Sequence, residues 1–271
     1  MRKVTFLGTG NASATKCYNS CFAISQNDET FLVDAGGGNQ IINNLKKARI
    51  SLDSIHNMFI SHSHTDHILG AVWIVRFIAM AKLKGTYGED FYIYGSSRVL
   101  DSLRTICKLA LPGNNTDFFD NTIVFVPVDH GQEENILGWS FTFFDIRGAS
   151  TEQYGFSIMF PDGIKLSFFG DEPCKDDLYS YGMNSDYMIH EAFCLYSQRN
   201  KYLPYEKHHA TVREACENAE KMNVQNLFLI HTEEDNLSDR KQLYTNEAKG
   251  FFKGTVYVPD DLDEIIIEPA D

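Results

Sequence analysis

The stretch Ser61-His62-Ser63-His64-Thr65-Asp66-His67-Ile68-Leu69 is the most informative part of this chain. It places three imidazoles and one carboxylate within six positions, at the spacing His-x-His-x-Asp-His. The run 57–60 before it predicts a buried strand, and the apolar run 68–83 after it predicts a helix. Polar side chains gathered at such a turn are costly to bury, so the cluster indicates a metal site far better than it indicates packing.

The spacing within this cluster predicts how its side chains divide between ions. Residues two apart in an extended segment face the same way, so His62 and His64 are expected to bind one ion together. Asp66 and His67 follow where the chain turns into the helix, and we expect them to hold a second ion. Imidazole and carboxylate donors suit Zn²⁺, and also Mn²⁺ or Fe, so one or two such ions are predicted.

Two later strand ends carry further side chains that bind metals. Asp171 follows the apolar strand 164–169, and His231 follows the apolar strand 226–230. A group shared by two cations should be an anion, so Asp171 is the expected bridge, and His231 is expected to complete the second site. Active sites tend to form at strand ends, where a rigid sheet holds converging loops.

Length and composition predict one soluble domain spanning residues 1–271. Of the 271 residues, 43% are hydrophobic and 23% are charged, which is enough for a substantial core. No run approaches the roughly 20 apolar residues that cross a bilayer, and the opening strand is too short for the core of a signal peptide. The six cysteines are scattered, which favours reduced thiols and a cytoplasmic protein.

The charge balance bears on the substrate. The chain has 24 basic and 37 acidic residues, a formal net charge of −13, and such a surface repels nucleic-acid backbones. Bound divalent ions would return positive charge to the cleft where a substrate reacts. The charge is therefore compatible with a small phosphate-bearing substrate and disfavours non-specific binding to DNA or RNA.

Strand-like and helix-like stretches alternate without a linker or a repeat. This pattern favours two sheets with helices outside them. Thr211 and Glu214 form a capping-box pattern at the start of one helix. The pattern predicts helices near 38–48, 68–84, 96–110, 209–223 and 238–252, and strands near 3–8, 20–25, 30–34, 56–61, 91–94, 122–128, 138–146, 154–160, 164–170, 186–190, 226–231 and 255–258.

Together these motifs resemble the metallo-β-lactamase superfamily, over nearly the whole chain from Phe6 to His231. The segments 6–10 (Phe-Leu-Gly-Thr-Gly), 190–193 (His-Glu-Ala-Phe) and 209–211 (His-Ala-Thr) resemble its ribonuclease Z branch. The resemblance implies an αβ/βα sandwich of two mixed β-sheets flanked by helices. It also implies a metal-dependent hydrolase, often of phosphodiesters and often a homodimer.

The resemblance also assigns roles to individual residues. It implies a zinc site at His62 and His64, a second at Asp66, His67 and His231, and a bridge at Asp171. Asp34, in the segment Asp-Ala-Gly-Gly of residues 34–37, matches an aspartate that orients a ligand. Glu191 and His209 match a pair that assists protonation of the leaving group.

We hypothesise hydrolysis by a metal-bound hydroxide, since a divalent ion lowers the pKa of its water to about 7. Asp66 would orient this nucleophile and accept its proton, while His209, held by Glu191, would protonate the leaving oxygen. The Glu191–His209 pair favours a phosphodiesterase or nuclease-like enzyme. The same metals could instead hydrolyse an ester, lactone or thioester.

One expected metal ligand is missing from the chain. The superfamily places a histidine shortly before a Gly-aromatic pair, and here Arg147 stands in or beside that place. A guanidinium has no lone pair to give a metal. The first site would then bind weakly or stay empty, His130 would substitute, or Arg147 would clamp an anionic substrate. Alternatively Arg147 is simply solvated, or the chain is a degenerate member that binds metal with little catalysis.

A second departure concerns tRNA. Members that process tRNA usually carry a long glycine- and proline-rich arm, but only the hairpin 159–165 joins the corresponding strands here. Together with the charge of −13, this disfavours tRNA as a substrate. A small-molecule or phosphodiester substrate is expected, with no membrane partner. A third departure, Phe193 in place of threonine, is expected to be tolerated.

Overall fold

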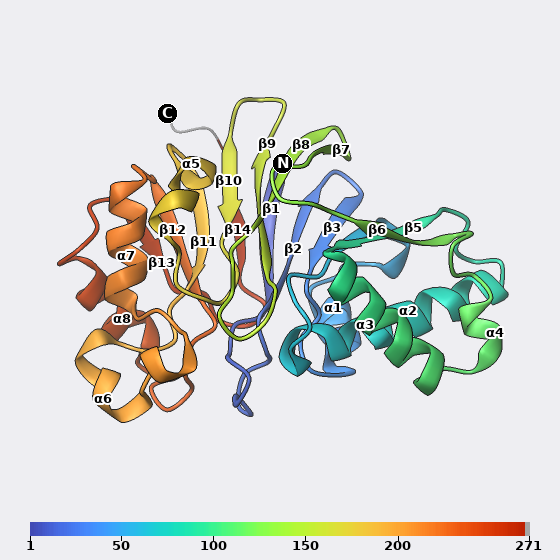
Figure 1. Cartoon of the computed structure of the whole chain (residues 1–271), viewed down its shortest axis with the longest axis horizontal. Coiled ribbons are helices and arrows are strands. Elements are labelled where there is room, and N and C mark those ends of the chain that lie inside the picture. The colour runs from blue at the N-terminus through green and yellow to red at the C-terminus, as the bar shows by residue number, and fades with distance from the viewer. Residues whose placement is uncertain (269–271) are drawn as a thin grey trace. The chain divides into compact units, whose positions relative to one another are not determined.

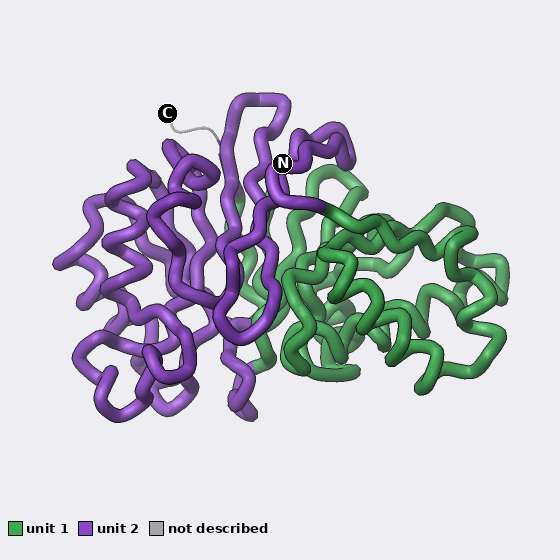
Figure 2. The backbone as a smooth tube through the Cα atoms, viewed as in Figure 1, with its two compact units in different colours: residues 1–8, 18–128, 261–266 green, residues 9–17, 129–260, 267–271 purple. Residues whose placement is uncertain are grey.

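The computed structural model describes residues 1–268 of the chain (Figure 1). These residues divide into two compact units (Figure 2). Unit 1 comprises residues 1–8, 18–128 and 261–266, and unit 2 comprises residues 9–17, 129–260 and 267–268. Within the described residues, each unit is built on one seven-stranded mixed sheet. The expectation of a single domain stays a prediction.

The sheet of unit 1 is antiparallel from β14 to β3 and parallel from β3 to β6. Its strands, in spatial order, are β14 (Glu264–Ile266), β1 (Arg2–Gly8), β2 (Cys21–Gln26), β3 (Glu29–Val33), β4 (Ile55–Phe59), β5 (Phe91–Gly95) and β6 (Ile123–Pro127). Its helices are α1 (Gln40–Lys47), α2 (Thr65–Leu83), α3 (Ser97–Ala110) and α4 (Gly113–Thr116), with the 3₁₀ turn η1 (Leu52–Ser54).

Helices α1, α2 and α3 pack on one face of this sheet. The α1 residue Leu45, the α2 residue Ile78 and the α3 residue Leu103 share a core with Met58 and Ile93 of the parallel strands. Each such side chain, fully buried, contributes roughly 1.5–3 kcal/mol to folding. The helices are fixed in this way against the sheet that contains β4, whose carboxyl end leads to the histidine cluster.

The sheet of unit 2 repeats the same order of pairings. It is antiparallel from β7 to β10 and parallel from β10 to β13. Its strands are β7 (Glu133–Ile136), β8 (Trp139–Asp145), β9 (Tyr154–Met159), β10 (Lys165–Phe168), β11 (Tyr187–Glu191), β12 (Asn226–Ile230) and β13 (Thr255–Tyr257). Its helices are α5 (Tyr179–Gly182), α6 (Arg199–Tyr202), α7 (Val212–Lys221) and α8 (Arg240–Ala248), with the 3₁₀ turns η2 (Asp176–Leu178), η3 (Tyr196–Gln198) and η4 (Tyr205–Lys207).

The core of unit 2 joins α7 and α8 to the parallel strands. Ala215 and Ala219 of α7 and Tyr244 of α8 pack with Met188 and Leu229. The α7 helix begins at the expected capping box. Thr211 is its N-cap residue, and the Glu214 side chain accepts a hydrogen bond from the Thr211 amide. Since parallel strands end at one edge of a sheet, β10, β11 and β12 bring the residues that follow them together.

Every helix and strand expected from the sequence is present, and the largest difference lies at the end of α8, at Ala248 rather than residue 252. The sequence missed the short strands β7 and β14, which carry no clear alternation, and the short helices α4, α5 and α6, each a single turn with no apolar periodicity to reveal it. Among residues 1–268, no helix combines the length and the apolar character that a membrane crossing needs. All six cysteines lie in this range, and none forms a disulfide.

Candidate functional site

The histidine cluster of unit 1 lies where β4 leads into α2. His62 and His64 occupy the connecting loop, His64 is the residue before the first helical turn, and Asp66 and His67 lie in that turn. Asp66 is favourably placed there because a helix N-terminus carries partial positive charge. His62, Asp66 and His67 are all buried. The motif therefore forms a cluster of metal-binding side chains in the interior of unit 1.

The donor atoms of this cluster lie close together. His62 Nε2 is 3.0 Å from His64 Nδ1, and the rings of His62 and His67 are centred 4.1 Å apart. Nε2 of His67 lies 3.3 Å from an Asp66 oxygen. Imidazole and carboxylate donors of this kind fit a zinc, manganese or iron ion.

Asp34 supports the histidine cluster through hydrogen bonds. It follows β3 with a φ of 54°, in the left-handed region, and it is buried. Its Oδ2 accepts hydrogen bonds from His67 Nδ1 at 2.8 Å and from Ser61 Oγ at 2.7 Å, and its Oδ1 accepts from the Ser61 amide at 2.8 Å. A carboxylate only accepts, so Nδ1 of His67 carries the proton and Nε2 keeps the lone pair.

Ser61 sets the protonated nitrogen of His62 in a similar way. Its hydroxyl proton is given to Asp34, so its oxygen is left to accept from Nδ1 of His62, 2.9 Å away. Nε2 of His62 therefore also keeps its lone pair. The family resemblance predicted that Asp34 orients a ligand, but the role of Ser61 was missed; its place directly before the first histidine was the only signal in the sequence.

Helix α2 approaches the Asp34 loop very closely. The amide of Gly70 donates to the carbonyl of Gly36 at 2.8 Å. A Cβ at Gly70 would lie 1.8 Å from the carbonyl oxygen of Ala35. Only glycine fits at this contact, which fixes the helix that carries Asp66 and His67 against the loop that carries Asp34.

In unit 2 the residues after β10 and β12 meet. Asp171 and His231 are both buried, and His231 Nε2 lies 3.4 Å from Asp171 Oδ2. His209 joins them, since Asp171, His209 and His231 offer donor atoms within 4.8 Å of one another. His231 has a φ of 57°, so its backbone is in the left-handed region that a residue with a side chain rarely adopts.

Glu191, the last residue of β11, anchors His209. Its Oε2 accepts from His209 Nδ1 at 2.7 Å, its Oε1 accepts from the Ala210 amide at 2.7 Å, and the carbonyl of Asp171 also lies 2.7 Å from Nδ1. Burial favours the neutral imidazole, but the Glu191 carboxylate outweighs burial and raises the pKa of His209 to about 9. Near neutral pH, His209 is therefore protonated on both nitrogens. Nδ1 gives its hydrogen bond to Glu191, and the proton on Nε2 can be transferred.

Phe193, the departure from the family segment, stacks on this histidine. The two rings are centred 4.7 Å apart at an interplanar angle of 7°. The stack adds a second restraint to the imidazole, because the hydrogen bond fixes one atom and the phenyl ring fixes the plane. The sequence showed the substitution but not this contact.

Arg147 and His130 lie elsewhere in unit 2. The guanidinium of Arg147 pairs with Asp177, and its side chain is half exposed. The His130 ring is exposed, with its nitrogens 3.3 Å from the Tyr181 hydroxyl and 3.2 Å from the Asp145 amide. Within unit 2, the structure therefore joins neither residue to Asp171, His209 and His231, and these contacts match the solvated alternative for Arg147.

Comparison with known proteins agrees with the fold. Ribonuclease Z of Thermococcus sibiricus is 26% identical over 309 aligned positions, covering 98% of this chain and 96% of that protein. The metallo-β-lactamase fold protein YhfI of Bacillus subtilis superposes with a TM-score of 0.80 at 17% identity, over 97% of this chain and 98% of that chain. The short form of human tRNase Z superposes with a TM-score of 0.75 at 21% identity, over 98% and 100%.

These likenesses confirm the expected fold class, a metallo-β-lactamase fold with two mixed sheets flanked by helices. They also confirm the resemblance to the ribonuclease Z branch. The family model described as Anti-Pycsar protein Apyc1 matches residues 2–255, which is most of the chain. This protein therefore belongs to the Anti-Pycsar protein Apyc1 family, on the ribonuclease Z-like side of the metallo-β-lactamase superfamily.

Proposed function

We propose that this protein is a metal-dependent hydrolase of phosphodiester bonds. The observation that carries the proposal is the pair formed by Glu191 and His209 directly beside Asp171 and His231. A histidine held on Nδ1 by a buried carboxylate is arranged to give a proton from Nε2. Phosphodiester hydrolysis needs such a group, because its leaving alkoxide must be protonated.

The proposed metal ligands are those that the resemblance assigns. They are His62, His64, Asp66, His67, Asp171 and His231, which would hold one or two ions, with zinc before manganese or iron. The fit rests on the donor set: buried imidazoles and carboxylates, with the lone pairs of His62 and His67 left on Nε2 by Ser61 and Asp34. When bound, divalent ions would activate water and polarise the phosphoryl group.

The chain's own residues would then carry the proton transfers. The Asp66 carboxylate would orient the attacking water and accept its proton. His209 would give its Nε2 proton to the leaving oxygen while Glu191 and Phe193 keep the ring in place. Glu191 is fully buried, so it would serve His209 without meeting the substrate.

The relatives bear on which phosphodiester is cleaved. Several are named ribonuclease Z, which supports an RNA substrate more than the chain's short hairpin and acidic charge suggested. We therefore place a tRNA precursor among the candidates, after small phosphodiesters. Ester, lactone or thioester hydrolysis is the second candidate chemistry, and a degenerate member with little catalysis is the third.

The test compares substrates on one metal-stripped preparation to which zinc, manganese or iron is added back. Bis-p-nitrophenyl phosphate, a tRNA precursor, a lactone panel and a thioester are assayed in parallel. We expect metal-dependent turnover of the phosphodiester, and its loss in His64→Ala and Asp66→Ala proteins that remain folded by circular dichroism. Turnover of lactones alone, or full activity in either variant, would contradict the proposal.

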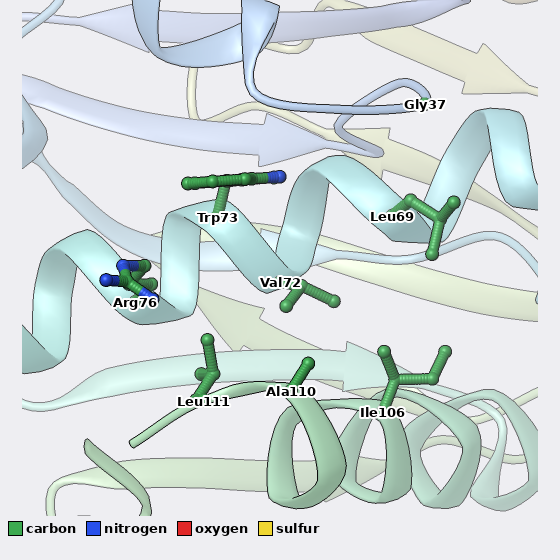
Figure 3. A pocket seen from close by; sticks show the side chains of 8 residues that line it. All are labelled: Gly37, Leu69, Val72, Trp73, Arg76, Ile106, Ala110 and Leu111. Carbon is green, nitrogen blue, oxygen red and sulfur yellow. The ribbon is translucent and has the colours of Figure 1, made fainter. Parts of the chain in front are cut away.

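We also propose that the protein is a homodimer that associates through α2 and α3. A cavity of about 290 Å³ opens between these helices, and apolar side chains dominate its lining (Figure 3). Trp73 is 36% exposed and Leu109 is 83% exposed on the same pair of helices. A second copy would cover this apolar surface. Light scattering should show a dimer that Trp73→Glu and Leu109→Glu dissociate, whereas the control Met159→Glu should not; a monomeric wild-type protein would contradict this.

The number of domains and the cellular location are also proposals. We propose that both units form one domain, because the relatives match nearly the full length of the chain. We also propose a cytoplasmic location, since six free thiols suit a reducing compartment. Limited proteolysis that releases two independently stable halves would contradict the first, and fractionation of the native cell would test the second.

A further inference from the structure

Arg240, in the first turn of α8, is a fully buried cation. Its Nη1 donates to the hydroxyls of Thr9 at 3.2 Å and Thr232 at 2.6 Å. Its Nη2 donates to the carbonyl of Pro259 and to an Asp260 oxygen, both at 2.8 Å. A guanidinium is costly to bury unless its hydrogen bonds are made, so the groups at the other end of these bonds are held firmly.

Thr232, the residue after His231, is held at three points. Its hydroxyl receives the hydrogen bond from Arg240. Its amide donates to the Thr9 carbonyl at 3.0 Å, and its own carbonyl accepts from the Asn11 amide at 3.0 Å. The backbone amide, the backbone carbonyl and the side-chain hydroxyl of Thr232 are thus all hydrogen-bonded, the hydroxyl to Arg240 of α8 and the backbone to residues 9–11.

The backbone conformation of His231 depends on these hydrogen bonds to Thr232. A φ of 57° is unfavourable for a residue with a Cβ, and such a conformation persists only where the surroundings impose it. β12 holds the chain up to Ile230, and Thr232 holds it directly afterwards. Between these two fixed points, the left-handed turn directs the imidazole to within 3.4 Å of Asp171 Oδ2.

We propose that Arg240 is a positioning residue for His231. Arg240 and Thr9 hold Thr232, and through Thr232 they keep the preceding imidazole oriented for a metal ion. This gives Thr9 a function, since its carbonyl accepts from the Thr232 amide and its hydroxyl accepts from Arg240. The inference rests on the proposed function, in which His231 is a ligand.

Lys241 offers a matched control. It follows Arg240 in α8 and pairs with the same Asp260, at 2.8 Å, but its side chain is half exposed. Lys241→Met therefore removes a neighbouring ion pair and leaves Thr9 and Thr232 untouched. Thr232→Val removes only the hydroxyl that Arg240 binds, with almost no change of shape, and Arg240→Lys keeps the charge but loses the forked geometry.

The experiment measures zinc affinity in metal-stripped protein by competition with a chromophoric chelator, beside the unfolding midpoint of each metal-free variant. We expect zinc affinity to fall about 10- to 100-fold in Thr232→Val and Arg240→Lys, as for other groups that orient ligands. Lys241→Met should bind within twofold of wild type. Saturating zinc should restore kcat in Thr232→Val, because the ligand is loosened and not removed.

A purely structural role predicts a different pattern, in which the unfolding midpoint falls while zinc affinity of the folded protein is unchanged. That result in Thr232→Val, which retains Arg240 and its other bonds, would overturn this inference while wild-type zinc binding leaves the proposed function standing. A wild-type protein that binds no metal would instead overturn the proposed function, and this inference with it.

Discussion

Nδ1 of His67 lies 2.8 Å from Oδ2 of Asp34, across 33 positions of sequence. The contact sets which nitrogen of His67 keeps its lone pair, and through Ser61 it does the same for His62. Asp34 therefore leaves the lone pairs of both His67 and His62 on Nε2, although Asp34 is not itself one of the proposed metal ligands.

Asp34→Asn should weaken metal binding about 10- to 100-fold while the fold survives. An asparagine amide can donate to Nδ1 of His67, which would place the ring proton on Nε2, where the metal would bind. Zinc competition on stripped protein measures the effect, and Asp53→Asn, an exposed aspartate of the same unit, is the control. Unchanged affinity in Asp34→Asn would show that Asp34 does not set the tautomer.

Glu191→Gln should separate substrates by their leaving groups. p-Nitrophenolate leaves without a proton, whereas an alkoxide needs one from His209. We expect kcat to fall about 10²-fold or more on an alkyl or nucleoside phosphodiester, and less than about tenfold on bis-p-nitrophenyl phosphate. Equal losses on both substrates would argue against His209 as the acid that Glu191 supports.

Removal of the metal should abolish hydrolysis and lower stability together. The buried imidazoles and carboxylates lose the cation that unites them, and a ligand at 100 times its Kd stabilises a folded protein by about 2.7 kcal/mol. Elemental analysis should find one or two ions per chain before chelation, with activity and melting temperature restored by zinc or manganese. Full activity in protein shown to be free of metal would be decisive against this.

His190 should make unfolding sensitive to acid. Burial lowers its pKa to about 4, from an ordinary 6.5, so the folded state stays neutral where the unfolded state takes up a proton. Stability from this group is complete above pH 6.5 and is lost as the pH falls toward 4. Between pH 7 and 4.5, wild type should lose about 2–3 kcal/mol more than His190→Asn in urea unfolding. Parallel pH profiles of the two proteins would contradict this.

Gly70→Ala should destabilise the protein although alanine is the better helix former by about 1 kcal/mol. Its Cβ would lie 1.8 Å from the Ala35 carbonyl, a contact with backbone that no rotamer relieves. We expect a loss of about 2 kcal/mol or more in the free energy of unfolding. Gly88→Ala, where the Cβ meets open space, is the matched control; equal stabilities would contradict the close packing of α2.

Local sequence determined the elements and most donor types. The alternation of apolar runs and turns predicted the longer strands, and the capping box of Thr211 and Glu214 predicted the start of α7. The spacing of His62, His64, Asp66 and His67 predicted donors at the start of α2. These features depend on neighbours within a few residues, so a single sequence contains them.

Tertiary structure alone decided which distant side chains meet. Arg147 pairs with Asp177, Phe193 stacks on His209, and Arg240 reaches Thr9 across 231 positions. Such contacts arise only when the sheet brings separate strand ends to one edge, and their energies depend on burial and geometry that spacing does not encode. The sequence therefore determined which donors this protein has, whereas the fold decided what orients each of them.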